Sequence, residues 1–288
     1  YKSFKSNEML KKIFSVIKII RPLNVTSSGI AILFSSQIAG YQGSTSNVLL
    51  AIFVVIFFTI GANVLNDFFD YETDKVNRPD RAIIAGNVTR IQALYISIFS
   101  FAAGVFLSLQ LNFNSQILSI FVSLPLLIFY NAKAKNYPLV GNVIVALILG
   151  LSFIYAGIVF ENIKPLIVPA LLAFGLTLIR EIVKDIADLE GDKIVGARTF
   201  PIIFGNEKAI YLCTFLSAIL GCLAFILFLN GYYNFYYGIL LIITVEIPLA
   251  VVVISLLNKP NTKTAKKGAK LLKFCTLGGL FSIYIGTI

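Results

Sequence analysis

The sequence contains no histidine and no tryptophan, and it has only three cysteines and one methionine. The lack of histidine removes serine–histidine catalysis and the commonest general base of enzymes. Cys213, Cys222 and Cys275 stand alone in apolar segments, without the spacing of a metal or redox site, and are interpreted as inert core thiols. What remains open is chemistry that depends on metal ions and fixed charges.

Charge is also scarce. Charged residues make up 13% of the chain, against about a quarter in soluble domains, while 58% is hydrophobic and the mean hydropathy is +0.87. Apolar runs of about 17–25 residues are typical of membrane-spanning helices, and the ten-residue alternation of a transmembrane barrel is absent. The fold class is therefore an all-α polytopic membrane protein, residues 1–288 forming a single domain. Nine spans are predicted: 25–41, 47–65, 91–111, 115–131, 139–160, 165–182, 208–229, 234–257 and 269–288.

The positive charges indicate a topology. Twenty-three of the 24 Lys and Arg residues lie in the N-terminal segment or in and beside the connections after the second, fourth, sixth and eighth predicted spans, and Lys164 is the exception. The positive-inside rule places these segments in the cytoplasm. The expected location is thus the cell membrane, with a cytoplasmic N-terminus and the C-terminus outside.

Two further expectations concern the membrane surface. Residues 8–21 mix basic and apolar side chains as an interfacial amphipathic helix does. The net charge of +10 favours contact with anionic membrane lipids. Nucleic acid is not an expected partner, because no soluble basic domain is present to bind it.

Ten of the 14 acidic residues lie between residues 67 and 80 or between residues 181 and 192. The windows 67–74 and 185–192 both carry aspartates at relative positions 0, 3 and 7, followed directly by lysine. Similar strings, Ile83–Asn87 and Ile202–Asn206, follow each window. This pattern indicates an internal repeat that presents two equivalent sites. The aspartates are Asp67, Asp70 and Asp74 in the first window and Asp185, Asp188 and Asp192 in the second.

The acidic windows predict metal sites. Positions three, four and seven apart share one face of a helix, so each window gathers its carboxylates at the end of a span. Carboxylates crowded near a membrane repel one another and need a compensating charge. Oxygen ligands without His or Cys suit Mg²⁺, which binds a few carboxylates and substrate phosphate oxygens. Two such sites facing each other would hold a diphosphate.

A diphosphate leaving group also requires cations. The candidates lie in the same predicted cytoplasmic layer, around the two windows and in the connection between the fourth and fifth spans. They are Lys75, Arg78, Arg81, Tyr130, Lys133, Lys135, Arg180, Lys184, Lys193 and Arg198. Arginine is favoured among them because its planar guanidinium matches phosphate oxygens in pairs.

The two motifs carry a resemblance to a known family. NDxxDxxxD, beginning at Asn66, and DxxDxEGDxxxGxRT, beginning at Asp185, resemble the motifs of the UbiA superfamily of intramembrane prenyltransferases. The resemblance runs from Arg21 to the ninth predicted span. It implies about nine helices around a central cavity, a cytoplasmic cap that carries both motifs, dependence on Mg²⁺ with two ions, and a lateral opening to the bilayer.

The resemblance also implies residue roles. By motif position, Asn66 and Asp70 would be the main ligands of one metal ion, and Asp188 and Asp192 those of the other. Asp67, Asp74 and Asp185 would assist, and the expected catalytic residues are Asp67, Asp70, Asp188 and Asp192.

Finer features resemble one branch of the superfamily, the archaeal digeranylgeranylglyceryl phosphate synthases. They are Arg21–Asn24, Asn77–Arg81, Tyr130–Asn142 and Arg180–Asp192. This implies transfer of a geranylgeranyl group from geranylgeranyl diphosphate to the free hydroxyl of geranylgeranylglyceryl phosphate, a step of ether-lipid synthesis. Arg21 or Asn24 would then hold the acceptor phosphate. Relatives read closer to Pro-Ile-Pro-Ser-Gly where this chain has residues 82–86, which affects the shape of that loop.

Two alternatives remain open at this stage. The same chemistry with an aromatic acceptor, as in quinone, haem or chlorophyll pathways, is poorly separated by sequence. A Mg²⁺ or cation transporter would need charged residues along a membrane pathway, and Glu246 is the only acid set deep in a predicted span.

Overall fold

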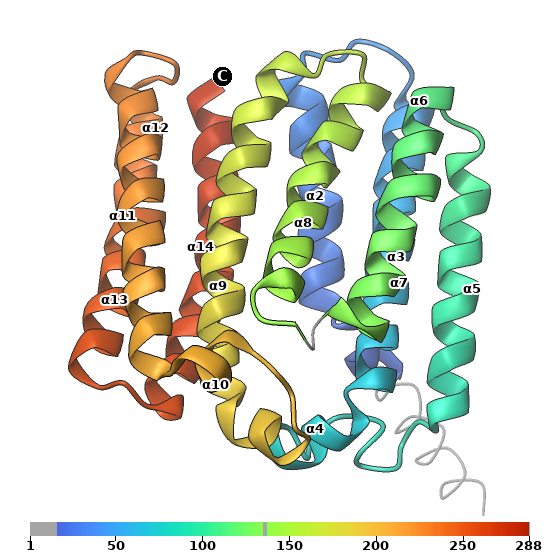
Figure 1. The fold of residues 1–288 in the computed structure, drawn as a ribbon. Coiled ribbons are helices and arrows are strands. Elements are labelled where there is room, and N and C mark those ends of the chain that lie inside the picture. The colour runs from blue at the N-terminus through green and yellow to red at the C-terminus, as the bar shows by residue number, and fades with distance from the viewer. Residues whose placement is uncertain (1–15, 135–136, 288) are drawn as a thin grey trace, which may run out of the picture. The chain divides into compact units, whose positions relative to one another are not determined.

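The structure, a computed structural model, describes residues 16–134 and 137–287, and these contain helices and turns but no strand (Figure 1). Eight helices in this part of the chain are long and apolar enough to cross a membrane. They are Thr45–Phe69, Arg90–Ser108, Phe113–Ala132, Val140–Val159, Lys164–Ile194, Asn206–Leu229, Phe235–Asn258 and Thr262–Thr287. The all-α, multi-pass fold class is thereby confirmed.

The first predicted span, 25–41, corresponds to α2 (Pro22–Ile38). With 17 residues, α2 has the lower limit of spanning length. Of the predicted interfacial helix at 8–21, residues 16–20 are helical, and residues 8–15 lie outside the described part.

The chain forms two compact units. Unit 1 comprises the chain up to Ile32 and Ser44–Ala132, and unit 2 comprises Leu33–Gly43 and Lys133–Ile288. The helix α2 therefore contributes its first part to unit 1 and its last part to unit 2. The remaining elements of unit 1 are α3 (Thr45–Phe69), α4 (Tyr71–Asn77), α5 (Arg90–Ser108), α6 (Phe113–Gln116), the π-helical turn η1 (Ile117–Ser123) and α7 (Leu124–Ala132).

In unit 1, α3 and α5 pack closely through glycine. A Cβ at Gly61 of α3 would lie 2.7 Å from the Phe101 ring of α5, and one at Gly104 of α5 would lie 2.4 Å from the Phe58 ring of α3. Because each glycine accepts an aromatic ring from the opposite helix, the two backbones approach closely, as is common between membrane helices. The Ser97 hydroxyl adds a hydrogen bond of 2.9 Å to the Gly61 carbonyl. This pair of helices fixes the end of α3, where the first acidic motif begins.

Unit 2 is built around α9 (Ile167–Ile194), which packs against α8, α11 and α14 (Figure 1). Its buried residues, including Ile179, Ile182, Val183 and Ile186, form the centre of an apolar cluster. The other elements of unit 2 are α8 (Val140–Val159), the 3₁₀ turn η3 (Lys164–Leu166), α10 (Phe200–Phe204), α11 (Asn206–Leu229), α12 (Phe235–Leu241), the π-helical turn η4 (Ile242–Glu246), α13 (Ile247–Asn258) and α14 (Thr262–Thr287).

The two strings that repeat after the acidic windows share a backbone feature. Gly86 has a φ of 72° and Gly205 a φ of 95°, values that side chains with a Cβ rarely adopt. Each glycine ends a short turn or helix before the next long helix, α5 or α11. The repeat seen in the sequence thus includes a glycine with a positive φ in each copy.

Candidate active site

The first acidic motif lies across a break between two helices. The helix α3 ends at Phe69, Asp70 adopts φ −84° and ψ 13°, and α4 begins at Tyr71. The sequence predicts one continuous helix face for the three aspartates, and the structure differs. Asp67 belongs to α3, Asp74 to α4, and Asp70 is the joint, although backbone hydrogen bonds from Asp70 to Asn66 and from Asp74 to Asp70 continue across it.

Asp67 is the most enclosed carboxylate of this motif, with a side chain 1% exposed. Its Oδ1 accepts hydrogen bonds from Arg21 Nη2 at 2.5 Å and from Arg81 Nη1 at 2.6 Å. The same Arg21 nitrogen donates to Asn66 Oδ1 at 2.7 Å. Arg21, predicted to bind the acceptor phosphate, and Arg81, predicted to bind the diphosphate, therefore meet at the first motif.

Asp74 is also buried, and Arg78 Nη1 lies 3.4 Å from its Oδ1. Burial raises the pKa of Asp74 to about 6, and the nearby arginines Arg81 and Arg78 oppose this shift. Burial and the neighbouring Arg21 guanidinium lower the pKa of Arg81. The first motif thus combines two buried carboxylates with three arginines.

Aromatic and basic side chains surround the joint at Asp70. The Arg90 guanidinium carbon lies 4.8 Å from the centre of the Phe68 ring and 5.1 Å from that of Tyr71, and Arg90 also donates to the Phe68 carbonyl at 3.3 Å. Lys75 lies 4.5 Å from the Tyr71 ring centre and pairs with Glu72 at 2.8 Å. Arg90, at the start of α5, therefore holds the residues on both sides of the joint.

The second acidic motif differs because α9 runs unbroken through it to Ile194. Asp185, Asp188 and Asp192 therefore share one helix face, as the sequence predicts. Asn142 of α8 donates from Nδ2 to Asp185 Oδ2 at 2.9 Å. This hydrogen bond fixes the first carboxylate of the motif to the neighbouring helix.

Two basic residues of α9 that were predicted to bind phosphate, Arg180 and Lys184, form ion pairs with Glu181. Glu181, buried within α9, lies 3.1 Å from Arg180 Nη1 and 2.5 Å from Lys184 Nζ, one carboxylate oxygen to each. Sequence reasoning assigned no role to Glu181 or Asn142. For Asn142 the available signal is an amide near the start of an apolar run, where a buried polar group requires a partner.

The remaining predicted residues are dispersed. Asn24 is half-buried near the start of α2, Tyr130 is half-buried in α7, and Lys133 and Arg198 are exposed. Lys135 lies outside the described residues.

The donor chemistry of both motifs fits Mg²⁺. Asn66, Asp70, Asp188 and Asp192 can each offer a side-chain oxygen, the ligand type that Mg²⁺ prefers. In residues 16–134 and 137–287, no three His, Cys, Asp or Glu side chains are gathered as a complete metal cage. Mg²⁺ does not need such a group, because it is commonly bound through one or two carboxylates and completes its shell with water and substrate phosphate.

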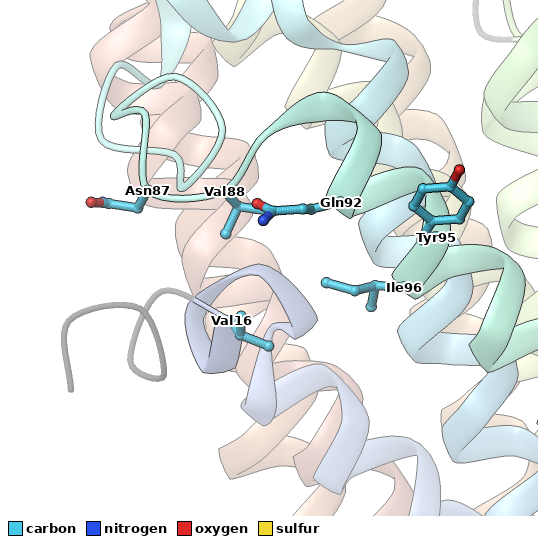
Figure 2. Close-up of a pocket in the computed structure, with 6 residues that line it drawn as sticks. All are labelled: Val16, Asn87, Val88, Gln92, Tyr95 and Ile96. Atoms are coloured by element: carbon cyan, nitrogen blue, oxygen red, sulfur yellow. The ribbon is translucent and has the colours of Figure 1, made fainter. Parts of the chain in front are cut away.

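A separate groove of about 380 Å³ lies in unit 1, between the helical residues near Val16 and the start of α5 (Figure 2). In Figure 2, Val88, Gln92 and Ile96 lie opposite Val16. None of the predicted site residues lines this groove, which is therefore distinct from the first acidic motif.

Comparison with known proteins places the chain in a family. The model of the UbiA prenyltransferase family matches residues 28–274, which includes both motifs. The digeranylgeranylglyceryl phosphate synthases of Pyrococcus furiosus and Pyrococcus horikoshii are 38% and 36% identical over 275 residues, which is 94% of this chain and 96% of each relative.

Solved structures of related proteins share the fold of this chain. A structure of a digeranylgeranylglyceryl phosphate synthase matches with a TM-score of 0.74 and 30% identity, covering 96% of this chain and 99% of that one. A UbiA homologue from Archaeoglobus fulgidus, bound to GPP and Mg²⁺, shares the fold with a TM-score of 0.63 at 15% identity, covering 93% of this chain and 99% of that one. The chain therefore belongs to the UbiA prenyltransferase family and is a multi-pass membrane prenyltransferase.

Proposed function

We propose that this prenyltransferase transfers a geranylgeranyl group from geranylgeranyl diphosphate to the free hydroxyl of geranylgeranylglyceryl phosphate, forming digeranylgeranylglyceryl phosphate. The observation that carries the proposal is the junction of an oxygen-only acidic motif with arginines, in which Arg21 contacts both Asn66 and Asp67. The names of two relatives that match 94% of this chain support the choice of substrates.

The proposed reaction breaks the bond between prenyl C1 and the diphosphate oxygen, and the electron pair leaves with the diphosphate. The acceptor hydroxyl oxygen bonds to C1, and its proton is released. Two Mg²⁺ ions, one held by Asn66 and Asp70 and the other by Asp188 and Asp192, would neutralise the charge of the diphosphate.

The protein's own cations would act on the same charge. Arg78 and Arg81, beside the first motif, are proposed to bind the diphosphate, and Arg21 the phosphate of the acceptor. Arginine suits this role because it binds phosphate oxygens bidentately. On the second motif, Glu181 would hold Arg180 and Lys184 in fixed positions near the aspartates.

The proposal includes an orientation. The distribution of Lys and Arg supports placing the N-terminus and both motifs on the cytoplasmic side. Anionic membrane lipids are proposed partners of these basic segments.

The decisive experiment is prenyl transfer by the purified protein in detergent. The protein receives geranylgeranyl diphosphate with either geranylgeranylglyceryl phosphate or an aromatic quinone precursor, in EDTA or in excess Mg²⁺. We expect a product with two prenyl ethers, formed only with Mg²⁺ and the glyceryl phosphate. Turnover of the aromatic precursor alone would agree with the prenyl-transfer chemistry of the family but refute geranylgeranylglyceryl phosphate as the acceptor.

A further inference from the structure

We propose that Asp67 is a positioning residue whose carboxylate holds Arg21 and Arg81 together as a pair that binds a phosphate group of a substrate. The motif resemblance instead makes Asp67 an assisting metal ligand. The inference rests on the proposed function for the identity of the phosphate-bearing substrate, and it assigns Arg21 and Arg81 to one phosphate group in place of a separate phosphate for each.

The first argument comes from exposure. The Asp67 side chain is 1% exposed, whereas those of Arg21 and Arg81 are 25% and 20% exposed. Both guanidiniums contact Asp67 Oδ1 and are more exposed than the carboxylate, so a ligand arriving from solvent meets the arginines first.

The second argument is charge. Two guanidiniums and one carboxylate leave an excess of one positive charge. Like charges repel, and the Asp67 Oδ1 atom, which accepts a hydrogen bond from each guanidinium, offsets the repulsion between the two arginines. A second anion bound on the exposed side of the two arginines would neutralise the excess positive charge. In the described part of the chain, Arg21 Nε is a buried donor and Asp67 Oδ2 a buried acceptor, each without a hydrogen-bond partner, and such groups are costly unless a ligand or water satisfies them.

The third argument is the backbone at Arg21. Its φ of 56° lies in the left-handed region, which is strained for arginine. Two side chains one turn apart on α3 maintain this conformation. Asn63 Nδ2 donates to the Ile20 carbonyl at 3.1 Å, and Asp67 accepts from the Arg21 side chain. The end of α3 thus fixes both the backbone before Arg21 and its guanidinium, as expected for a preorganised binding group.

Phosphate is the chemistry that fits a pair of arginines with one excess charge. It has two sources in this reaction: the diphosphate of the donor and the phosphate monoester of the acceptor. The experiment separates them with two probes, inorganic pyrophosphate and glycerol phosphate.

The test measures binding of each probe to the purified protein by calorimetry, in detergent with EDTA. The variants are Asp67→Asn, which keeps the shape of the side chain, Arg81→Gln, and the double variant. Asp80→Asn is the matched control, because Asp80 lies in the same segment but is exposed and pairs with Lys18. Melting temperatures verify that each variant is folded.

We expect the wild type to bind at least one probe, and the probe that binds more tightly identifies the substrate. Asp67→Asn and Arg81→Gln should each weaken that binding about tenfold or more, and the double variant should be no weaker than the worse single variant. Asp80→Asn should bind as the wild type does. If Asp67→Asn fails to fold, Asp67→Glu, which moves the carboxylate by one methylene group, replaces it with the same expectation.

Three results would overturn the inference. The first is that the wild type binds neither probe. The second is that Asp67→Asn and Arg81→Gln bind as tightly as the wild type. The third is that Asp67→Asn binds normally in EDTA while its transfer activity requires about tenfold more Mg²⁺, which assigns Asp67 to the metal. Because calorimetry needs no turnover, a wild type that transfers no prenyl group would refute the proposed function while leaving this test intact.

Discussion

Replacing Glu181 with glutamine removes the negative charge that Arg180 and Lys184 share. The side chain of Glu181 is 7% exposed, and each carboxylate oxygen receives one cation, at 3.1 Å and 2.5 Å. Glutamine fills nearly the same volume, so packing around α9 should be preserved. What changes is that two neighbouring cations lose their counterion.

The magnitude follows from the exposure of the partners. Breaking a fully buried ion pair by removing one member costs about 3–5 kcal/mol. Here the side chains of Arg180 and Lys184 are 24% and 30% exposed, so water compensates for part of the loss. The expected destabilisation is about 2–3 kcal/mol.

The assay is denaturant unfolding in detergent micelles, which gives a midpoint and a slope for each variant. Glu190→Gln is the matched control, because Glu190 is on the same helix but exposed, and its effect should remain within about 0.5 kcal/mol. If Glu181→Gln unfolds at the wild-type midpoint with an unchanged slope, the buried charge network does not stabilise α9 and the reasoning is refuted.

Three further predictions concern the motifs and their supports. Asp70→Ala and Asp188→Ala should each abolish prenyl transfer while the protein still elutes as a folded species; measurable turnover in either would remove that residue from the metal site. Asn142→Leu should lose about 1.5–3 kcal/mol of stability, since it removes a hydrogen bond to the Asp185 carboxylate, and an unchanged unfolding midpoint would contradict this. Gly61→Val should destabilise unit 1 by about 1–3 kcal/mol, because the new side chain would overlap an aromatic ring of α5; thermal unfolding at the wild-type temperature would show that the helices can separate freely.

The spans and the motifs were predictable because their signals are local. Apolar runs give the long helices, and the spacing of Asp185, Asp188 and Asp192 gives their shared face on α9. The break at Asp70 has no such signal, since residues 66–75 contain neither glycine nor proline. The bend is stabilised from outside the motif, by Arg90 against Phe68 and Tyr71, and such tertiary contacts override local helix preference.

The contacts of the basic residues were not predictable from the sequence for the same reason, because they are tertiary contacts. Sequence places Arg21, Arg81, Arg180 and Lys184 near the acids but does not specify which acid each one contacts. Arg21 and Asp67 are 46 residues apart, and their hydrogen bond depends on how the start of α2 meets the end of α3. Glu181 lies close to its partners in the sequence. However, only its burial, which the sequence does not give, shows that it is a structural counterion and not a solvated charge.

The contrast between an unbroken α9 and a jointed α3–α4 also determines how each motif would tolerate a change in chain length. One residue inserted in α9 ahead of Asp185 would rotate every following carboxylate by about 100° around the helix axis. That rotation would move Asp185 away from Asn142, and no turn lies between the insertion and Asp192 to restore the register. An insertion after Gly86 would fall in an exposed turn that precedes α5 and leave Asn66, Asp67, Asp70 and Arg81 where they are. The carboxylates of the second motif therefore keep their positions only if the number of residues in α9 is unchanged. The first motif is followed by turns that can accommodate a change in chain length.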